Sequence, residues 1–208
     1  MTKRASLWTW MIAYAALVLL GACGDDAREP PPRTEAPSTT EGVTSAALAE
    51  LLVEHWDIEV ALDPLIATYL GDHRADAELP PIRRDDVQAL RDRRHALLAR
   101  VMALDVAALE PGDQLTRAIL AERLTAAVGL EVCDYARWAI SPRGSTVHRL
   151  DQLGDYHPLL ASEDATSYLS RVAAVPAAID AYADELAAGA APGETAGRQP
   201  VQGAISLF

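Results

Sequence analysis

Apolar residues recur at every third or fourth position along most of the chain beyond residue 43, and this spacing predicts amphipathic helices. The first predicted helix covers residues 45–62, with Thr44 or Ser45 as its N-cap. One face of it collects side chains at helical spacing: Leu48, Leu51, Leu52, His55, Ile58 and Leu62. The alternation typical of strands is not evident, so the pattern favours an all-α fold built as an array of antiparallel helices.

The same spacing predicts further helices, interrupted at proline and glycine. A short helix over residues 65–70 follows Pro64 and ends at Gly71. Longer helices are expected over residues 85–104, 113–138, 162–175 and 177–188. The apolar stripe of the helix over residues 113–138 is expected to hold Leu115, Ile119, Val128 and Val132. Pro176 is expected to break or kink the helix that precedes it.

Two stretches show no regular period, and we expect both to be irregular. They are residues 141–161 and the tail over residues 191–208. The chain is thus divided into residues 1–22, a tether over residues 23–43, a helical domain over residues 44–190 and the irregular tail. The tether is rich in proline, serine and threonine, a composition typical of a disordered, semi-extended linker.

The first 23 residues have the layout of a secretory signal. Lys3 and Arg4 precede an apolar run, which ends at Leu20-Gly21-Ala22-Cys23. These four residues resemble a bacterial lipobox, which implies cleavage between Ala22 and Cys23 and lipidation of Cys23 by palmitate or similar acyl chains. An uncleaved membrane anchor and a plain signal peptide with a coincidental cysteine are the alternatives. Gly24 follows the cysteine, and by the same resemblance we expect a lipid-anchored protein of the bacterial cell envelope, which in a Gram-negative cell would lie on the outer membrane and face the periplasm.

Composition narrows the possible partners and chemistries. The formal net charge of −12 argues against nucleic acid as a partner, so we expect the membrane partner to be reached through the lipid on Cys23. Lys3 is the only lysine, which excludes lysine-based covalent chemistry in a chain cleaved after Ala22. With Cys23 acylated, Cys133 is the one remaining thiol, so an internal disulfide is not expected.

No complete catalytic or metal-binding pattern occurs along the chain. The five histidines do not show the H-E-x-x-H spacing of a helical zinc site, so neither catalytic nor metal-ligating residues are assigned. The polar loop over residues 141–156 is the best candidate for facing a ligand, through His148, Arg149 and Asp151. An ordinary polar loop is the alternative interpretation.

Several blocks, taken in order, resemble the bacterial family catalogued as domain of unknown function 885. The opening block runs from Pro64 to Arg74 and contains Ala67-Thr68 and Leu70-Gly71-Asp72, with Trp56 on the preceding helix. Leu104-Asp105, Leu109 to Asp113, Tyr168-Leu169, Val175-Pro176, Ile179-Asp180 and Gly189 match later segments. The resemblance covers about residues 48–190 of this chain and implies a largely helical protein that is often exported or lipid-anchored.

The resemblance further implies a likeness to zinc metallopeptidases. The family's zinc element, of the type H-E-x-x-x-G-H-H, lies downstream of the matched region, so no ligand is transferred to this chain and no cofactor is expected in it. We therefore expect the N-terminal portion of a larger helical metallopeptidase-like fold, inactive alone, whose partner is a C-terminal remainder. The alternatives are a self-sufficient helical envelope lipoprotein that binds or scaffolds something, and a hydrolase that uses non-standard residues.

Overall fold

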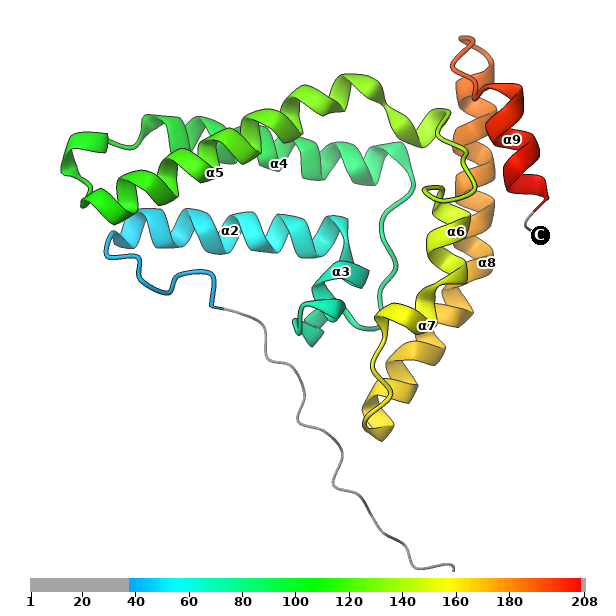
Figure 1. Cartoon of the computed structure of the whole chain (residues 1–208), viewed down its shortest axis with the longest axis horizontal. Coiled ribbons are helices and arrows are strands. Elements are labelled where there is room, and N and C mark those ends of the chain that lie inside the picture. Colours follow the sequence, from blue (N-terminus) through cyan, green and yellow to red (C-terminus); the bar gives the residue numbers. More distant parts are fainter. Residues whose placement is uncertain (1–37, 207–208) are drawn as a thin grey trace, which may run out of the picture. The chain divides into compact units, whose positions relative to one another are not determined.

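A computed structural model describes residues 38–206, and within that range the chain forms helices and no strand (Figure 1). The all-α prediction is therefore confirmed. The predicted signal and most of the predicted tether lie outside the described residues, as do residues 207 and 208.

The first described helix, α2, spans Ala46–Leu62 and begins as predicted. Ser45 is its N-cap, and the Ser45 hydroxyl accepts a hydrogen bond from the backbone N–H of Leu48 at 3.3 Å. Helix α3 follows over Pro64–Tyr69, with Asp63 as its cap. Gly71 ends this segment with a positive φ of 92°, a conformation that glycine adopts without steric cost.

Helices α4 (Arg84–Ala103) and α5 (Pro111–Leu130) pack against each other, and both contact α2 (Figure 1). A short 3₁₀ helix, η2 (Val106–Ala108), connects them. The core between the three helices consists of Leu48, Leu51, Ile58, Leu97, Val101, Leu120, Ala121 and Leu124. Full burial of such a side chain contributes roughly 1.5–3 kcal/mol, so this cluster is the main source of stability for the three-helix layer.

The predicted inner face of α5 is wrong. Leu115 and Ile119 are 64% and 60% exposed, whereas Leu120 and Leu124 are buried. Helix α5 has apolar residues on two faces, and the sequence pattern alone cannot say which one meets α2 and α4. The helix also ends at Leu130 instead of continuing to residue 138. Two 3₁₀ turns follow it, η3 (Glu131–Cys133) and η4 (Tyr135–Arg137).

The stretch over residues 141–161, expected to be irregular, contains two short helices. Helix α6 spans Thr146–Asp151, and helix α7 spans Leu153–Tyr156. The Ser145 hydroxyl caps α6 by accepting from the N–H of His148 at 3.3 Å. This serine cap is a local signal for a helix start that the proline- and glycine-rich composition of the stretch concealed.

Helix α8 runs without interruption over Ser162–Ala190, so the predicted break at Pro176 is wrong. The side chain of Asp164 caps its start by accepting from the N–H groups of Leu160 and Ala161. The tail expected to be irregular also contains a helix, α9, over Arg198–Ile205. In Figure 1, α6 lies along α8, in agreement with the contacts between the two helices.

Candidate functional site

The three residues predicted to face a ligand do not converge. His148 and Arg149 are half-buried on α6, while Asp151 is exposed at the end of that helix. Arg149 lines a pocket whose walls include neither His148 nor Asp151. Its Nη2 lies 2.5 Å from Oδ1 of Asp63, the residue that caps α3, and the two side chains are about one third exposed. Whether any of the three residues faces a ligand stays a prediction.

The pocket beside Arg149 has a volume of about 180 Å³ and mostly apolar walls. It lies where α2, α3, α4, α6 and α8 approach the segment between η1 (His73–Ala75) and α4. Its lining includes Leu65, Pro81, Val87, Leu150 and Tyr182. Burial raises the pKa of Tyr182, whose hydroxyl donates a 2.9 Å hydrogen bond to the carbonyl of Ala139. An apolar cavity with one ion pair at its edge can bind a small apolar group, since such sites combine hydrophobic walls with a few polar contacts.

The most deeply buried charge is Arg171 of α8, which the sequence analysis did not single out. Its side chain is fully buried. Nε donates to the carbonyl of Glu78 at 2.9 Å, and Nη2 lies 3.1 Å from the Pro64 carbonyl and 3.0 Å from the Ala75 carbonyl. Burial lowers the pKa of Arg171, while the carboxylates of Asp76, Glu78 and Asp63 oppose that shift. The guanidinium thus ties α8 to the backbone around α3 and η1.

His157 completes this buried cluster on the side of α7. Nη1 of Arg171 lies 2.9 Å from Nδ1 of His157, and because a guanidinium only donates, Nδ1 accepts. Nε2 of His157 lies 2.8 Å from the carbonyl of Asp164 and therefore carries the proton. Both ring nitrogens are occupied in this arrangement, so His157 is a structural residue that holds α8 and the preceding loop together.

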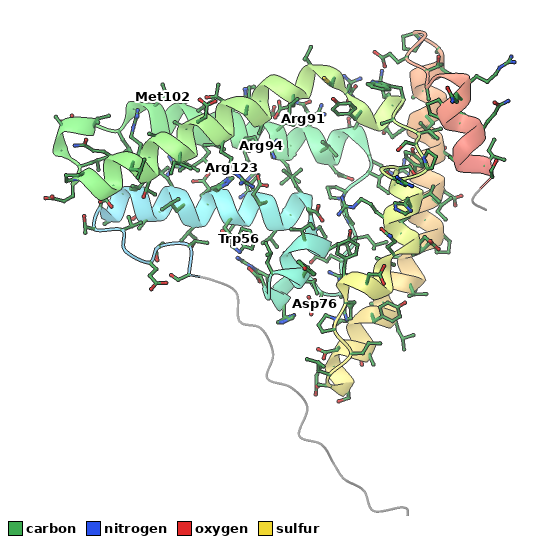
Figure 2. All side chains as sticks on the ribbon, viewed as in Figure 1. Trp56, Asp76, Arg91, Arg94, Met102 and Arg123 are labelled. Atoms are coloured by element: carbon green, nitrogen blue, oxygen red, sulfur yellow. The ribbon has the colours of Figure 1, made fainter. Side chains whose placement is uncertain are left out.

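A second chain of contacts leads from Arg171 to the block Asp72–Asp76. Nη2 of Arg171 donates to the Thr68 hydroxyl at 2.7 Å, which lies 2.6 Å from Oδ1 of Asp76. The other carboxylate oxygen of Asp76 lies 2.9 Å from Nδ1 of His73. Figure 2 shows Asp76 beside α3. One carboxylate oxygen of Asp76 thus contacts Thr68, and the other contacts His73.

Asp72 is bound in a similar way at the end of α2. The indole N–H of Trp56 donates to its Oδ2 at 2.7 Å, and Nε of Arg74 lies 2.9 Å from the same oxygen. Burial works against the charge, but the hydrogen bonds from Arg74 and Trp56 outweigh it and hold the pKa of Asp72 below its ordinary value. Nη1 of Arg74 also donates to Asp57 at 2.6 Å. Each of these polar side chains is used to join α2, α3 and η1.

The residues present do not fit a metal centre. Within residues 38–206, no three His, Cys, Asp or Glu side chains lie together so that they could hold a metal ion. The predicted lipidation site at Cys23, and Ala22 before it, lie outside the described residues. Over residues 38–206, helices that combine the length and the apolarity needed to cross a membrane are also not found.

Comparison with known families gave one match. The family model described as "Bacterial protein of unknown function (DUF885)" matches residues 64–208, well over half of the chain. Comparison with curated proteins and with solved structures gave no match. The matched region begins at Pro64, the residue that opens α3 and supplies a carbonyl to Arg171.

Proposed function

The chain belongs to the bacterial DUF885 family of unknown function, and from this membership we propose that it is the lipid-anchored helical frame of a zinc-metallopeptidase-like envelope protein. In this role the described residues hold the frame in shape, and the hydrolytic chemistry belongs to a C-terminal remainder. The observation that carries the proposal is the buried Arg171 cluster. Its charged and polar groups form hydrogen bonds that join α8 to α3 and η1.

The polar residues that carry the family resemblance support this role. Asp72 binds Trp56 and Arg74, and Asp76 binds Thr68 and His73, so these side chains connect helices. A general acid or base needs a titratable group with a free position toward a substrate. The carboxylates of this block are instead surrounded by partners from their own chain, as expected of a structural core.

Exposed apolar side chains on α8 also support a frame that packs against further protein. Leu169 is 64% exposed, Val172 is 42% exposed and Ile179 is 41% exposed. They follow one another at i, i+3 and i+10, so they share one side of the helix. Apolar stripes of this kind are typical of surfaces that meet another part of a protein.

Lipid attachment can be tested directly by feeding labelled palmitate to bacteria that express the full chain. We expect label in the wild-type protein and none in Cys23→Ala, because the acyl acceptor is then missing. Cys133→Ala is the matched control, since it removes the other thiol and leaves the lipobox intact. Label in Cys23→Ala, or its loss from Cys133→Ala, contradicts anchoring through Cys23.

The proposal that this chain is a frame without hydrolytic activity of its own can be tested with the purified full chain. We expect no hydrolysis of a mixed peptide library, with or without added zinc, because the described donor groups do not fit a zinc site. Peptide cleavage that a chelator abolishes and zinc restores would contradict the frame role. Addition of the separately produced C-terminal remainder of a DUF885 relative with the zinc element is the informative control.

A second candidate function is a stand-alone envelope lipoprotein that binds a small apolar ligand. The observation that favours it is the pocket of about 180 Å³ beside Arg149 and Tyr182. Thermal unfolding of the full chain, followed by circular dichroism, separates the two functions. A frame that lacks its partner should unfold in a broad transition, because its apolar faces are exposed, whereas a stand-alone binding protein should unfold cooperatively.

A further inference from the structure

Three arginines converge on Asp134, which lies between η3 and η4. Its carboxylate oxygens are 3.7 Å from Nη2 of Arg84, 3.6 Å from Nη2 of Arg91 and 3.6 Å from Nε of Arg137. Arg84 and Arg91 are seven residues apart on α4, two turns along the same face. Arg137 comes from η4, three residues after Asp134. Figure 2 shows Arg91 on α4.

Most guanidinium N–H groups of this cluster make no hydrogen bond to a described residue. All three distances exceed the range of a hydrogen bond, so Asp134 holds the guanidinium groups by charge alone. Arg91 is only 16% exposed, yet its guanidinium makes no hydrogen bond to any described residue. Nε of Arg137 is buried and likewise has no hydrogen-bond partner among residues 38–206. Buried guanidinium groups normally bind acceptors, because leaving a buried donor unpaired is costly.

Two further carboxylates lie beside this cluster. Glu194 is 3.3 Å from Nη1 of Arg137, and Oε1 of Glu185 accepts a hydrogen bond from the backbone N–H of Arg84 at 2.9 Å. Neither of them pairs with the guanidinium of Arg91.

In the neighbouring cluster on α4, the arginine makes hydrogen bonds to two carboxylates, although its Nε is also buried without a partner among residues 38–206. There Nη2 of Arg94 lies 3.4 Å from Glu59, and Nη1 lies 3.3 Å from Glu131. Glu131 also lies 2.8 Å from Nε2 of His95. Figure 2 shows Arg94 and Arg123 between α2 and the α4–α5 pair.

The backbone at Asp134 is held in an uncommon conformation. Its φ is 38°, and it is the one residue other than glycine with a positive φ within the described range. Such a conformation costs energy for a residue with a Cβ, although Asp and Asn tolerate it best. In this conformation the carboxylate lies within 3.7 Å of guanidinium groups from both α4 and η4.

We propose that Arg84, Arg91 and Arg137 form a binding site for a phosphate group, in which Asp134 occupies the place of the anion when no ligand is bound. A phosphate group presents at least three acceptor oxygens in different directions, whereas a carboxylate presents two in one plane. Three guanidinium groups from α4 and η4 therefore suit a phosphate better. A bound phosphate would accept hydrogen bonds from the guanidinium N–H groups that have no partner among the described residues. The site is independent of the frame role proposed above.

The first experiment titrates inorganic phosphate into the full chain in an uncharged detergent, by calorimetry at low ionic strength, with chloride at equal ionic strength as the reference. We expect saturable binding of phosphate beyond that of chloride, weakening as salt is added. Short-chain dihexanoyl phosphatidylglycerol, titrated below its micelle concentration, identifies the source of the phosphate. Tighter binding than inorganic phosphate indicates a lipid headgroup, and equal or weaker binding indicates a soluble phosphate. Absence of saturable phosphate binding overturns the proposal.

Variants of the cluster make the test specific. Arg91→Gln should weaken phosphate binding by about tenfold, the loss expected for a charge-assisted contact. Arg93→Gln is the matched control, because Arg93 is exposed on the same helix and its replacement removes an equal charge. If Arg91→Gln does not fold, as judged by circular dichroism, Arg84→Gln takes its place, since Arg84 is 48% exposed. Equal weakening by the cluster variant and the control overturns the site.

Asp134→Asn separates a binding site from a purely structural ion cluster. Asparagine tolerates the same backbone conformation and keeps the shape of the side chain, but it lacks the competing charge. A phosphate site should therefore bind severalfold more tightly in Asp134→Asn. If Asp134 only stabilises the arginines, the substitution should loosen the cluster and weaken or abolish phosphate binding, and that outcome overturns the proposal.

Discussion

Arg171 shows how a single residue determines the packing of α8. Replacement by methionine preserves much of the side-chain volume but leaves the carbonyls of Pro64, Ala75 and Glu78 without their donor. We expect Arg171→Met to lower the free energy of unfolding by about 3–5 kcal/mol, as for other broken buried charge clusters. Urea denaturation checks this value. Arg93→Met, at an exposed position, should stay within about 0.5 kcal/mol of wild type, and a comparable loss there would contradict the assignment.

The sequence allowed local residue roles to be predicted, but not those that depend on distant partners. Ser45 as a cap and Gly71 as a helix stop are confirmed, because both act on neighbours within a few positions. Arg171 was missed because all its hydrogen-bond partners except His157 lie 93 to 107 residues away in the chain. Arg149 was selected with His148 and Asp151 from a polar stretch, and only the fold shows that Arg149 alone lines the pocket. The i, i+7 spacing of Arg84 and Arg91 was the one available signal for the arginine cluster.

At the scale of elements, the end of α8 depends on a glycine that lets η4 approach closely. A Cβ at Gly189 would lie 2.9 Å from the Cβ of Arg137 and 3.0 Å from the carbonyl oxygen of Glu194, and closer still to the carbonyl oxygen of Arg137. We expect Gly189→Ala to destabilise the protein by about 1–3 kcal/mol, the usual cost of overpacking. Chemical denaturation followed by circular dichroism measures this.

Gly129 provides the opposite case within α5. Nothing lies within 4 Å of a Cβ at this helical position. Gly129→Ala should therefore stabilise the protein by about 0.5–1 kcal/mol, because alanine loses less backbone entropy on folding than glycine. A loss of stability in Gly129→Ala would contradict the open surroundings of this position. Unchanged stability in Gly189→Ala would show that Gly189 does not limit the approach of η4 to α8.

The errors in the predicted elements have definite physical causes. Pro176 does not interrupt α8 because Val172, whose carbonyl loses its partner four residues earlier, lies on an exposed part of the helix where water can replace the missing N–H. Helix α6 escaped notice because its start depends on one serine cap between proline and glycine residues. The exposed face of α5 was mistaken for the buried one because both faces are apolar.

For the whole molecule, the all-α class could be predicted, since it follows from local spacing. The number of helices and the two polar centres could not be predicted, because α6, α7 and α9 lie in stretches without a regular period and α8 continues through Pro176. The Arg171 cluster and the arginines around Asp134 combine residues from separate helices, and each arises only when α8 or η4 docks on the layer of α2, α4 and α5. The family resemblance drew attention to the block around Asp72 and Asp76, which lies within the matched residues 64–208. It did not reveal that this block serves to join α2, α3 and η1.

The stability of the whole molecule should depend on acid through Asp113, which joins the start of α5 to the segment before α2. The Thr44 hydroxyl donates to Oδ2 at 2.8 Å, and the N–H of Ser45 donates to the same oxygen at 2.7 Å. The Thr44 hydrogen bond comes first in lowering the pKa of Asp113 below its ordinary 3.8. Because the folded pKa is the lower one, this stabilisation is fully present above pH 3.8 and is lost as the pH falls through the folded value.

Replacing Asp113 should therefore change stability in a pH-dependent way. Asp113→Asn should lower the melting temperature most near pH 7, and the difference from wild type should shrink as the pH is lowered below 3.8, because the wild-type carboxyl then becomes protonated as well. Thermal unfolding between pH 7 and pH 2, followed by circular dichroism, provides the comparison. Asp180→Asn, at an exposed site of α8, controls for the loss of one negative charge. A difference from wild type that is the same at every pH would mean that the carboxylate of Asp113 contributes through its shape and not through its charge.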